Sequence, residues 1–259
     1  MASRRRRAAS ATAVVPLPAI RGALSSASAS SAVVSVPTAP EAGEPRWAQA
    51  VPVPKAYKAH RTTIAETEFR TISLAQINDL ASLMKDVATK ADVRDSHDNA
   101  PITWDTVNMY HINEHVVLPL TSRFKCPFVE LLASGPQKPR WFVSHWWGTP
   151  FRSSVALLNF HAVKRQLPPE TLYWICTFAN NQHDLSDLQG SLHATPFVKA
   201  ILSQECEGTL ALLDKKVTPF SRIWCVLENF VSTSWAREAA LKPLPHRYDI
   251  AAWLPAGSG

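Results

Sequence analysis

The chain has 259 residues, of which 46% are hydrophobic, and a net charge of +6. This is enough for one large domain or two small ones with a hydrophobic core. No apolar run reaches the roughly 18 residues that a membrane helix needs, so no membrane span is predicted.

The positive charge is concentrated at the N-terminus. Residues 1–46 contain six arginines and two glutamates, a net +4, which leaves only +2 for the other 213 residues. A nucleic-acid-binding domain usually carries a basic stripe on its folded part. Nucleic acid is therefore not a predicted partner.

Residues 1–55 are predicted to form a disordered basic tail rich in Ala, Ser and Pro, because such a segment cannot bury enough apolar surface to offset its ordering entropy. Its Arg-rich, Ser-rich, acid-poor start also fits an organelle transit peptide, and Arg4–Arg7 fits a nuclear signal. A secretory signal is disfavoured because Pro16 and Pro18 interrupt the apolar region. We expect a cytoplasmic protein, with organelle or nuclear targeting as alternatives.

The cysteines have no CxxC pairing or regular spacing, which favours buried free thiols in a reducing compartment over disulfides. They are Cys126, Cys176, Cys206 and Cys225. Cys176 with His183 and His193 does not provide the close ligand pairs of a zinc site. No metal or other cofactor is predicted to be required.

Residues 56–137 are predicted to form a helical extension. Ser73 and Gln76 make a capping-box pattern at the start of its first helix. The apolar positions that follow share one helical face: Ile77, Leu80, Met84 and Val87.

A second helix is predicted over residues 103–119 and is expected to end at Pro119. His111, Glu114 and His115 have helical spacing within it, which raises the question of a metal site. Because no further ligand accompanies them, a surface helix face is the favoured interpretation.

Residues 138–259 alternate between strand and helix patterns. Apolar runs at 142–146, 172–178, 208–214 and 247–253 are predicted strands, and helices are predicted at 196–204 and 221–231. Another helix starts after strand 142–146, where Thr149 is the expected N-cap, Pro150 the first helical residue and Pro168–Pro169 the stop. Its predicted buried face is Phe151, Val155, Leu158 and Ala162. Such alternation predicts an α/β fold with a flavodoxin-like parallel sheet and helices on both faces.

Ligands of open parallel sheets bind beyond the carboxyl ends of the strands, where the strand order reverses. In the flavodoxin-like order the first and third strands are neighbours at that point. Their ends carry Ser144–Gly148 and Asp214. A binding crevice is predicted there.

The helix over 221–231 is predicted to place Ser221, Trp224 and Glu228 side by side at the edge of its buried face. The inward face itself is predicted to be Ile223, Leu227, Phe230 and Val231. A carboxyl group beside an indole is partly desolvated, which raises its pKa and suits acid/base chemistry. From these residues alone, a solvent-facing glutamate with a structural tryptophan is favoured.

Residues 221–228, SRIWCVLE, resemble the S-x-W-C-x-x-E signature of Toll/interleukin-receptor (TIR) domains, whose glutamate is catalytic in the members that cleave NAD. Residues 196–214 resemble the helix and strand before that signature. SHWWG at 144–148 and YWICTFANNQHDL at 173–185 resemble motifs of the related HET domain. In the latter the matching positions are Trp174, Ile175, Asn181, Gln182 and Asp184. The combined set resembles that of a large group of proteins in unicellular eukaryotes within the TIR/HET-like (STIR) superfamily.

Three departures from these families stand in the sequence. Cys176 occupies the position of the HET aspartate, and Arg222–Ile223 adds one residue between Ser221 and Trp224. The sequence also stops before the last strand and helix of a full TIR domain, so a truncated sheet is expected.

The resemblance implies a signalling domain that cleaves or binds NAD or a related nucleotide. Glu228 would be the catalytic acid and would hold the ribose hydroxyls. The ligand-binding residues would be Ser144, His145, Trp146, Trp147, Gly148, Asn180, Asn181, Gln182, Asp214, Ser221 and Trp224. NAD would be the substrate rather than a cofactor. Against this reading, eight glycines form neither a GxGxxG motif nor a P-loop.

Two alternatives remain. The first is a non-catalytic protein-interaction module that self-associates or binds a protein partner. The second is an enzyme with a Cys176/His183 or Ser144/His145 nucleophile pair. It is disfavoured because Cys176 is expected in the middle of a buried strand, and because adjacent strand residues point to opposite faces.

Overall fold

The computed structural model describes residues 44–236 and 245–253, which belong to one compact unit. The predicted tail over residues 1–43 lies outside the described residues. Residues 44–55, assigned to that tail from the sequence, instead pack against the rest of the chain: a 3-10 turn at Arg46–Gln49 buries Trp47, and Val51 is also buried.

The described strands form one five-stranded sheet in the order β1-β3-β2-β4-β5. Their bounds are β1 Ile72–Ser73, β2 Trp141–His145, β3 Leu172–Trp174, β4 Gly208–Leu213 and β5 Arg247–Ala252. All pairings are parallel except that of β1 with β3. The predicted α/β fold with a mostly parallel sheet is confirmed, and the first and third parallel strands, β2 and β4, are neighbours as expected.

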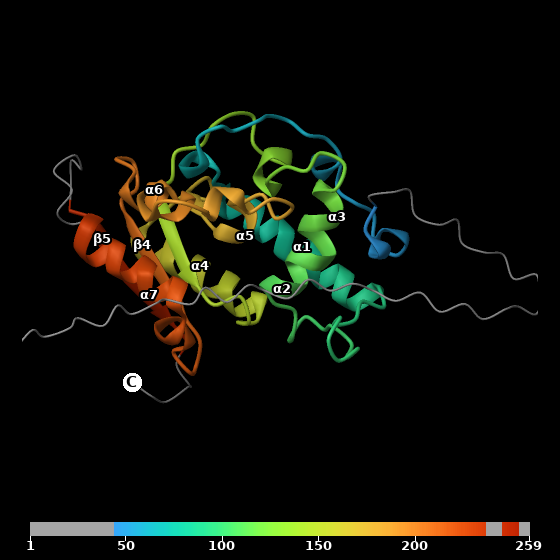
Figure 1. Cartoon of the computed structure of the whole chain (residues 1–259). Coiled ribbons are helices and arrows are strands. Elements are labelled where there is room, and N and C mark those ends of the chain that lie inside the picture. The colour runs from blue at the N-terminus through green and yellow to red at the C-terminus, as the bar shows by residue number, and fades with distance from the viewer. Residues whose placement is uncertain (1–43, 237–244, 254–259) are drawn as a thin grey trace, which may run out of the picture. The chain divides into compact units, whose positions relative to one another are not determined.

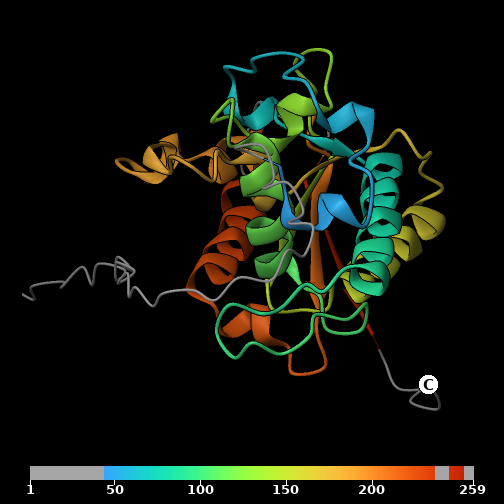
Figure 2. The same cartoon turned by 90° about the vertical axis from the view of Figure 1, so that its right-hand side faces the viewer.

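Helices cover both faces of this sheet (Figure 1). The longer ones are α1 Leu74–Lys90, α4 Phe151–Arg165, α6 Pro196–Leu202 and α7 Ile223–Phe230, and single turns form α2 Met109–Ile112, α3 Leu118–Thr121 and α5 Cys176–Ala179. Helices α1 and α4 pack together, α6 and α7 pack together, and Figure 2 shows α1 and α7 on opposite sides of the sheet.

Strand β2 is buried on both faces, and its side chains alternate between two hydrophobic cores. Trp141 and Val143 belong to the core that contains the α1 and α4 residues, whereas Phe142 belongs to the core that contains α6. The same alternation directs Ser144, two residues after Phe142, toward α7.

Helix α1 confirms the sequence prediction closely. Both hydrogen bonds of the Ser73–Gln76 capping box are present. The predicted apolar face is buried, as is that of α4. However, Pro150 occupies the N-cap of α4, and the hydroxyl of Thr149 has no hydrogen-bond partner, so the predicted Thr149 cap is wrong.

The helix predicted over 103–119 begins later and does not end at Pro119. The Asn108 side chain caps its start at Met109, and the helical path continues through a π turn at 113–117 to Thr121. Pro119 cannot donate to the carbonyl of His115, four residues earlier. The indole Nε1 of Trp47 donates to that carbonyl instead, at 2.7 Å. A residue distant in sequence therefore stabilises the helix at its proline.

Two of the three polar residues of this helix bond to side chains outside it. The Nε2 of His111 lies 2.7 Å from Oδ2 of Asp95, and Glu114 accepts a hydrogen bond from Ser96 at 3.0 Å. His111 is buried, so the expectation of a surface face is wrong at that position.

The second predicted strand, 172–178, is also shorter than expected. β3 ends at Trp174, and a helical turn, α5, starts at Cys176. Cys176 therefore does not lie in the middle of a strand. Cys126, Cys176 and Cys225 are free thiols, as predicted, and Cys126 and Cys225 are buried.

Candidate functional site

A cavity of about 550 Å³ lies beyond the carboxyl ends of β2 and β3, against the first turns of α7. This is the edge of the sheet where strand order reverses and where ligands of such sheets usually bind. Its size falls within the range of roughly 300–1,000 Å³ that is typical of small-molecule sites.

The cavity brings together most of the residues that the sequence singled out. They are His145, Trp146, Trp147, Asn180, Gln182, Ser221, Trp224 and Glu228. They come from the end of β2, the segment after β3 and the start of α7. The motifs at 144–148, 173–185 and 221–228 therefore share one concave surface.

Ser144 and Gly148 support the cavity without lining it. The fully buried Ser144 hydroxyl donates a hydrogen bond to Oε2 of Glu228 at 2.6 Å. A Cβ atom at Gly148 would lie 2.3 Å from the Trp146 ring, so glycine is needed for that indole to fold back over the turn. The roles of these two residues are to orient a carboxyl group and an indole.

Asn181 and Asp214 also lie outside the cavity lining, and each holds a loop. The amide of Asn181 donates to the Lys125 carbonyl at 2.8 Å. Asp214 accepts from the backbone N–H and the hydroxyl of Thr218 at 2.6 and 2.7 Å. The two bonds to Asp214 hold the loop that precedes α7. In this loop Val217 has a left-handed backbone conformation (φ 57°), which a β-branched residue rarely adopts.

Helix α7 is rotated relative to the sequence prediction. Its buried residues are Cys225 and Glu228, whereas Ile223 is 81% exposed and Phe230 is 49% exposed. The predicted inward face is therefore wrong at these two positions, although Val231 is buried. The prediction placed the largest apolar side chains of the helix in the core. In the structure Glu228 is buried instead, where it accepts a hydrogen bond from Ser144.

Glu228 is the most strongly perturbed acid of the cavity. Burial raises its pKa to about 8, and the hydrogen bond from Ser144 partly opposes that shift. A carboxyl group with this pKa exchanges its proton near neutral pH, which is a common property of catalytic acids and bases.

His145 and Asn180 provide polar groups that no other described side chain pairs with. Neither ring nitrogen of His145 bonds to another side chain, and Oδ1 of Asn180 has no hydrogen-bond partner. Both residues are buried, and burial lowers the pKa of His145 to about 4, so its ring is neutral at pH 7. Buried polar groups are normally hydrogen-bonded, and because these atoms are closed to solvent, a polar ligand would pair with them only after a small movement of the cavity wall.

The two nucleophile pairs considered from the sequence are not formed. Ser144 bonds to Glu228 rather than to His145. His183 contacts Thr121 and Lys125, whereas Cys176 accepts from the indole of Trp147 at 3.2 Å. Burial raises the pKa of Cys176 to about 12, which leaves it a neutral thiol.

The cavity also includes residues that sequence reasoning missed. These lining residues are Tyr110, Leu185, Leu188, Phe197, Arg222, Ile223 and Cys225, and Cys176, considered from the sequence only as a nucleophile, also lines the cavity. Arg222 and Cys225 lie within a motif already noted, so their proximity could have been inferred. Tyr110 could not, because only tertiary packing brings its ring to 5.4 Å from that of Trp147.

The pKa of Glu228 predicts how stability depends on pH. Folding raises it from 4.5 to about 8, so between these values the folded state binds the extra proton. The free energy of unfolding should therefore fall as pH rises through this window, by at most about 1.4 kcal/mol per pH unit. Urea unfolding of the natural protein and of Glu228→Gln at a series of pH values will measure this slope.

The clearest interval for this measurement is pH 6.5 to 8. Below pH 6.5 the titration of His145 makes stability rise with pH, opposite to the effect of Glu228, because folding lowers the pKa of His145 from 6.5 to about 4. Between pH 6.5 and 8 the Glu228→Gln protein should show a shallower decline than the natural one. Equal slopes would contradict the raised pKa.

Comparisons with protein-family models, with curated proteins and with solved structures gave no match. None of the helices in the described part of the chain combines the length and apolar character required to cross a bilayer.

Proposed function

We propose that the cavity binds NAD or a related nucleotide and that Glu228 promotes cleavage of the nicotinamide–ribose bond. The observation that carries this proposal is the buried carboxyl group of Glu228 in the wall of a cavity that also contains His145 and three tryptophans. The resemblance of residues 221–228 to the TIR signature supports it. So does the strand order β3-β2-β4-β5, which is the one expected for a TIR/HET-like, flavodoxin-like sheet.

The cavity walls suit a flat heterocycle attached to a polar sugar. Trp146, Trp147 and Trp224 offer indole surfaces against which a base or nicotinamide ring could stack. His145 and Asn180 offer polar side-chain atoms, and Glu228 offers a carboxyl group for ribose hydroxyls. A mostly apolar pocket with a few convergent polar groups is the usual form of a cofactor or nucleotide site.

The proposed reaction breaks the bond between C1′ of ribose and the nicotinamide nitrogen. Nicotinamide leaves as a neutral molecule with the bonding electrons, so it needs no added proton. Water attacks C1′ and releases one proton, which gives ADP-ribose. Ionised Glu228 would accept hydrogen bonds from the ribose hydroxyls and stabilise the positive charge that develops on the sugar. The cationic nicotinamide of the bound substrate favours this ionised form.

The direct test is to incubate the purified protein with NAD and to quantify nicotinamide by chromatography. Release of nicotinamide that depends on Glu228 would support the proposal. No release, or release that is unchanged in the Glu228→Gln protein, would remove it.

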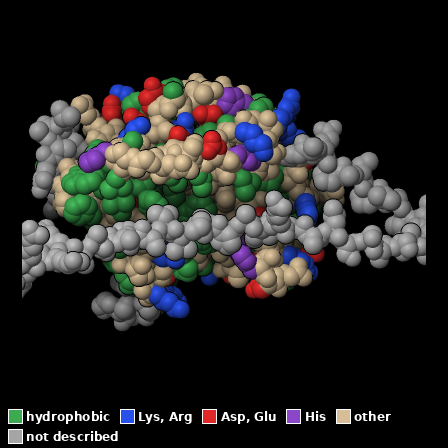
Figure 3. Space-filling view, in the orientation of Figure 1, with side chains coloured by type: hydrophobic (Ala, Val, Ile, Leu, Met, Phe, Trp, Pro, Cys, Tyr) green, Lys and Arg blue, Asp and Glu red, His purple; other side chains and the backbone are tan. Residues whose placement is uncertain are grey.

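A second candidate function, signalling through self-association, is favoured by the outward face of α7. Ile223, Trp224, Val226 and Phe230 are 81%, 52%, 46% and 49% exposed. Hydrophobic side chains gather over the region of α7 in Figure 3. Exposed apolar patches often mark protein interfaces. We propose a second copy of this chain as the partner, in a cytoplasmic setting that the free thiols of Cys126, Cys176 and Cys225 support.

Val226→Glu is expected to weaken this self-association by about tenfold or more, because a charge at the patch centre would have to lose its water. Sedimentation velocity over a range of protein concentrations will measure the effect. Val163→Glu, on α4 and 74% exposed, is the matched control and should behave like the natural protein. Natural protein that remains monomeric at high concentration would exclude this candidate.

A further inference from the structure

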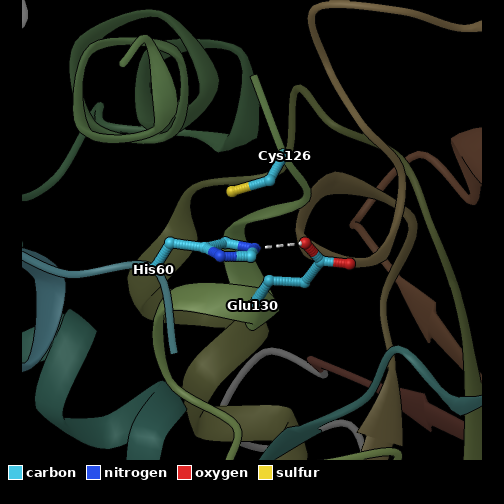
Figure 4. A group of neighbouring side chains, drawn as sticks. All are labelled: His60, Cys126 and Glu130. Atoms are coloured by element: carbon cyan, nitrogen blue, oxygen red, sulfur yellow. Dashed lines mark hydrogen bonds and ion pairs between the residues drawn. The ribbon is translucent and has the colours of Figure 1, made fainter. Parts of the chain in front are cut away.

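We propose that His60, Cys126 and Glu130 bind a zinc ion. A ring nitrogen of His60, the Sγ atom of Cys126 and a carboxylate oxygen of Glu130 all lie within 4.8 Å of one another. In Figure 4 one nitrogen of the His60 ring faces the Glu130 carboxylate, and the Cys126 thiol lies beside the same ring. This cluster is separate from the cavity described above.

The ligand set matches the chemistry of zinc. Thiolate, imidazole and carboxylate together favour Zn²⁺ over Mg²⁺ or Ca²⁺, which prefer oxygen ligands alone. Tetrahedral coordination would separate the ligand atoms by roughly 3.4–3.6 Å, given the usual zinc–ligand distances. His60 and Glu130 are now 2.9 Å apart, so the two groups need to separate by less than one ångström.

Glu130 is already oriented for this role. Its Oε1 atom accepts a hydrogen bond from the Ile64 backbone N–H at 2.8 Å, which leaves Oε2 directed at His60. Such outer hydrogen bonds are typical of carboxylates that bind metals. The His60 side chain is 28% exposed, so water can reach the cluster and supply a fourth ligand.

The charges of the cluster also fit a divalent cation. Glu130 is 2% exposed and Cys126 is 6% exposed, and a buried carboxylate is stabilised by a nearby positive charge, which His60 supplies when protonated and which a metal ion would supply in its place. Zn²⁺ would bind with loss of the thiol proton to solvent, and the thiolate and carboxylate would then neutralise both charges of the metal.

The site would stabilise the segment that supports the cavity. Lys125, next to Cys126, has the carbonyl that holds Asn181 at 2.8 Å. Phe128, between Cys126 and Glu130, packs against Phe178 of α5 with ring centroids 5.6 Å apart. A metal at this cluster would therefore connect the segment around His60 to the supports of the Asn180–Gln182 loop.

Cobalt(II) is the appropriate probe, because it occupies zinc sites and absorbs visibly when bound by thiolate in tetrahedral geometry. We expect the purified full chain to bind one equivalent of Co²⁺ with a thiolate-to-cobalt charge-transfer band, which an equivalent of Zn²⁺ abolishes. Zn²⁺ should also raise the Tm of the protein, since a ligand of the folded state alone stabilises it.

Three variants distinguish this site from others. Cys126→Ser should lose the charge-transfer band, and Cys206→Ser, at another buried cysteine, should keep it. His60→Ala, at the most exposed of the three ligands, should fold and bind Co²⁺ at least about tenfold more weakly. Absence of the band in the natural protein, its survival in Cys126→Ser, or unchanged affinity in His60→Ala would overturn the proposal.

Discussion

Glu228→Gln is expected to lower kcat/KM for NAD cleavage by about 10²–10⁴-fold, the range typical of losing a positioned acid or base. Glutamine keeps the shape of the side chain and can still accept the Ser144 hydrogen bond of 2.6 Å. It cannot carry the negative charge that the proposed transition state requires. Nicotinamide release at saturating and subsaturating NAD will measure kcat and kcat/KM separately.

Glu170→Gln is the matched control, because Glu170 is exposed and lies outside the cavity. It should retain full activity. In the natural protein kcat/KM should rise with pH through about 8, where free Glu228 loses its proton. A flat profile, or full activity in the Glu228→Gln protein, would refute the proposed role of this residue.

Trp174→Ala is expected to destabilise the fold by about 3–5 kcal/mol, the cost of removing a fully buried large aromatic side chain. Trp174 stacks on Phe142 with ring centroids 5.2 Å apart, and its Nε1 donates to the Thr67 carbonyl at 3.0 Å. It therefore joins two strands of the sheet to the N-terminal segment. Because total stability is typically only about 5–15 kcal/mol, a sizeable unfolded fraction should appear on mild heating.

Urea unfolding followed by far-UV circular dichroism will measure this loss. Trp253→Ala is the control, since Trp253 is 54% exposed and should change stability by less than about 0.5 kcal/mol. Trp174→Phe keeps most of the apolar contact and removes the hydrogen bond to Thr67. The free energy of unfolding of Trp174→Phe should therefore lie between those of Trp174→Ala and Trp253→Ala. Equal stability of Trp174→Ala and Trp253→Ala would contradict the packing described here.

Local patterns determined the class of fold and the location of the candidate site. The apolar runs of β2 and β4 and the cap at Ser73 act over a few residues, so they can be read without knowing the tertiary structure. Chain order and handedness rules then placed Ser144–Gly148 beside the start of α7. For this reason most of the predicted ligand residues do line one cavity.

The tertiary structure decided what depends on partners far apart in the chain. Pro119 does not end its helix because Trp47 donates to the His115 carbonyl, 68 residues away from it. The cluster of His60 with Cys126 and Glu130 also has no local sequence pattern. Helix α7 is the clearest case. Its apolar residues are compatible with Glu228 facing either solvent or the protein interior. In the structure Glu228 faces the interior, where it accepts the Ser144 hydrogen bond and lines the cavity together with residues of other elements. Burial of that carboxyl group, and hence its raised pKa, is a property of the assembled fold rather than of the helix sequence.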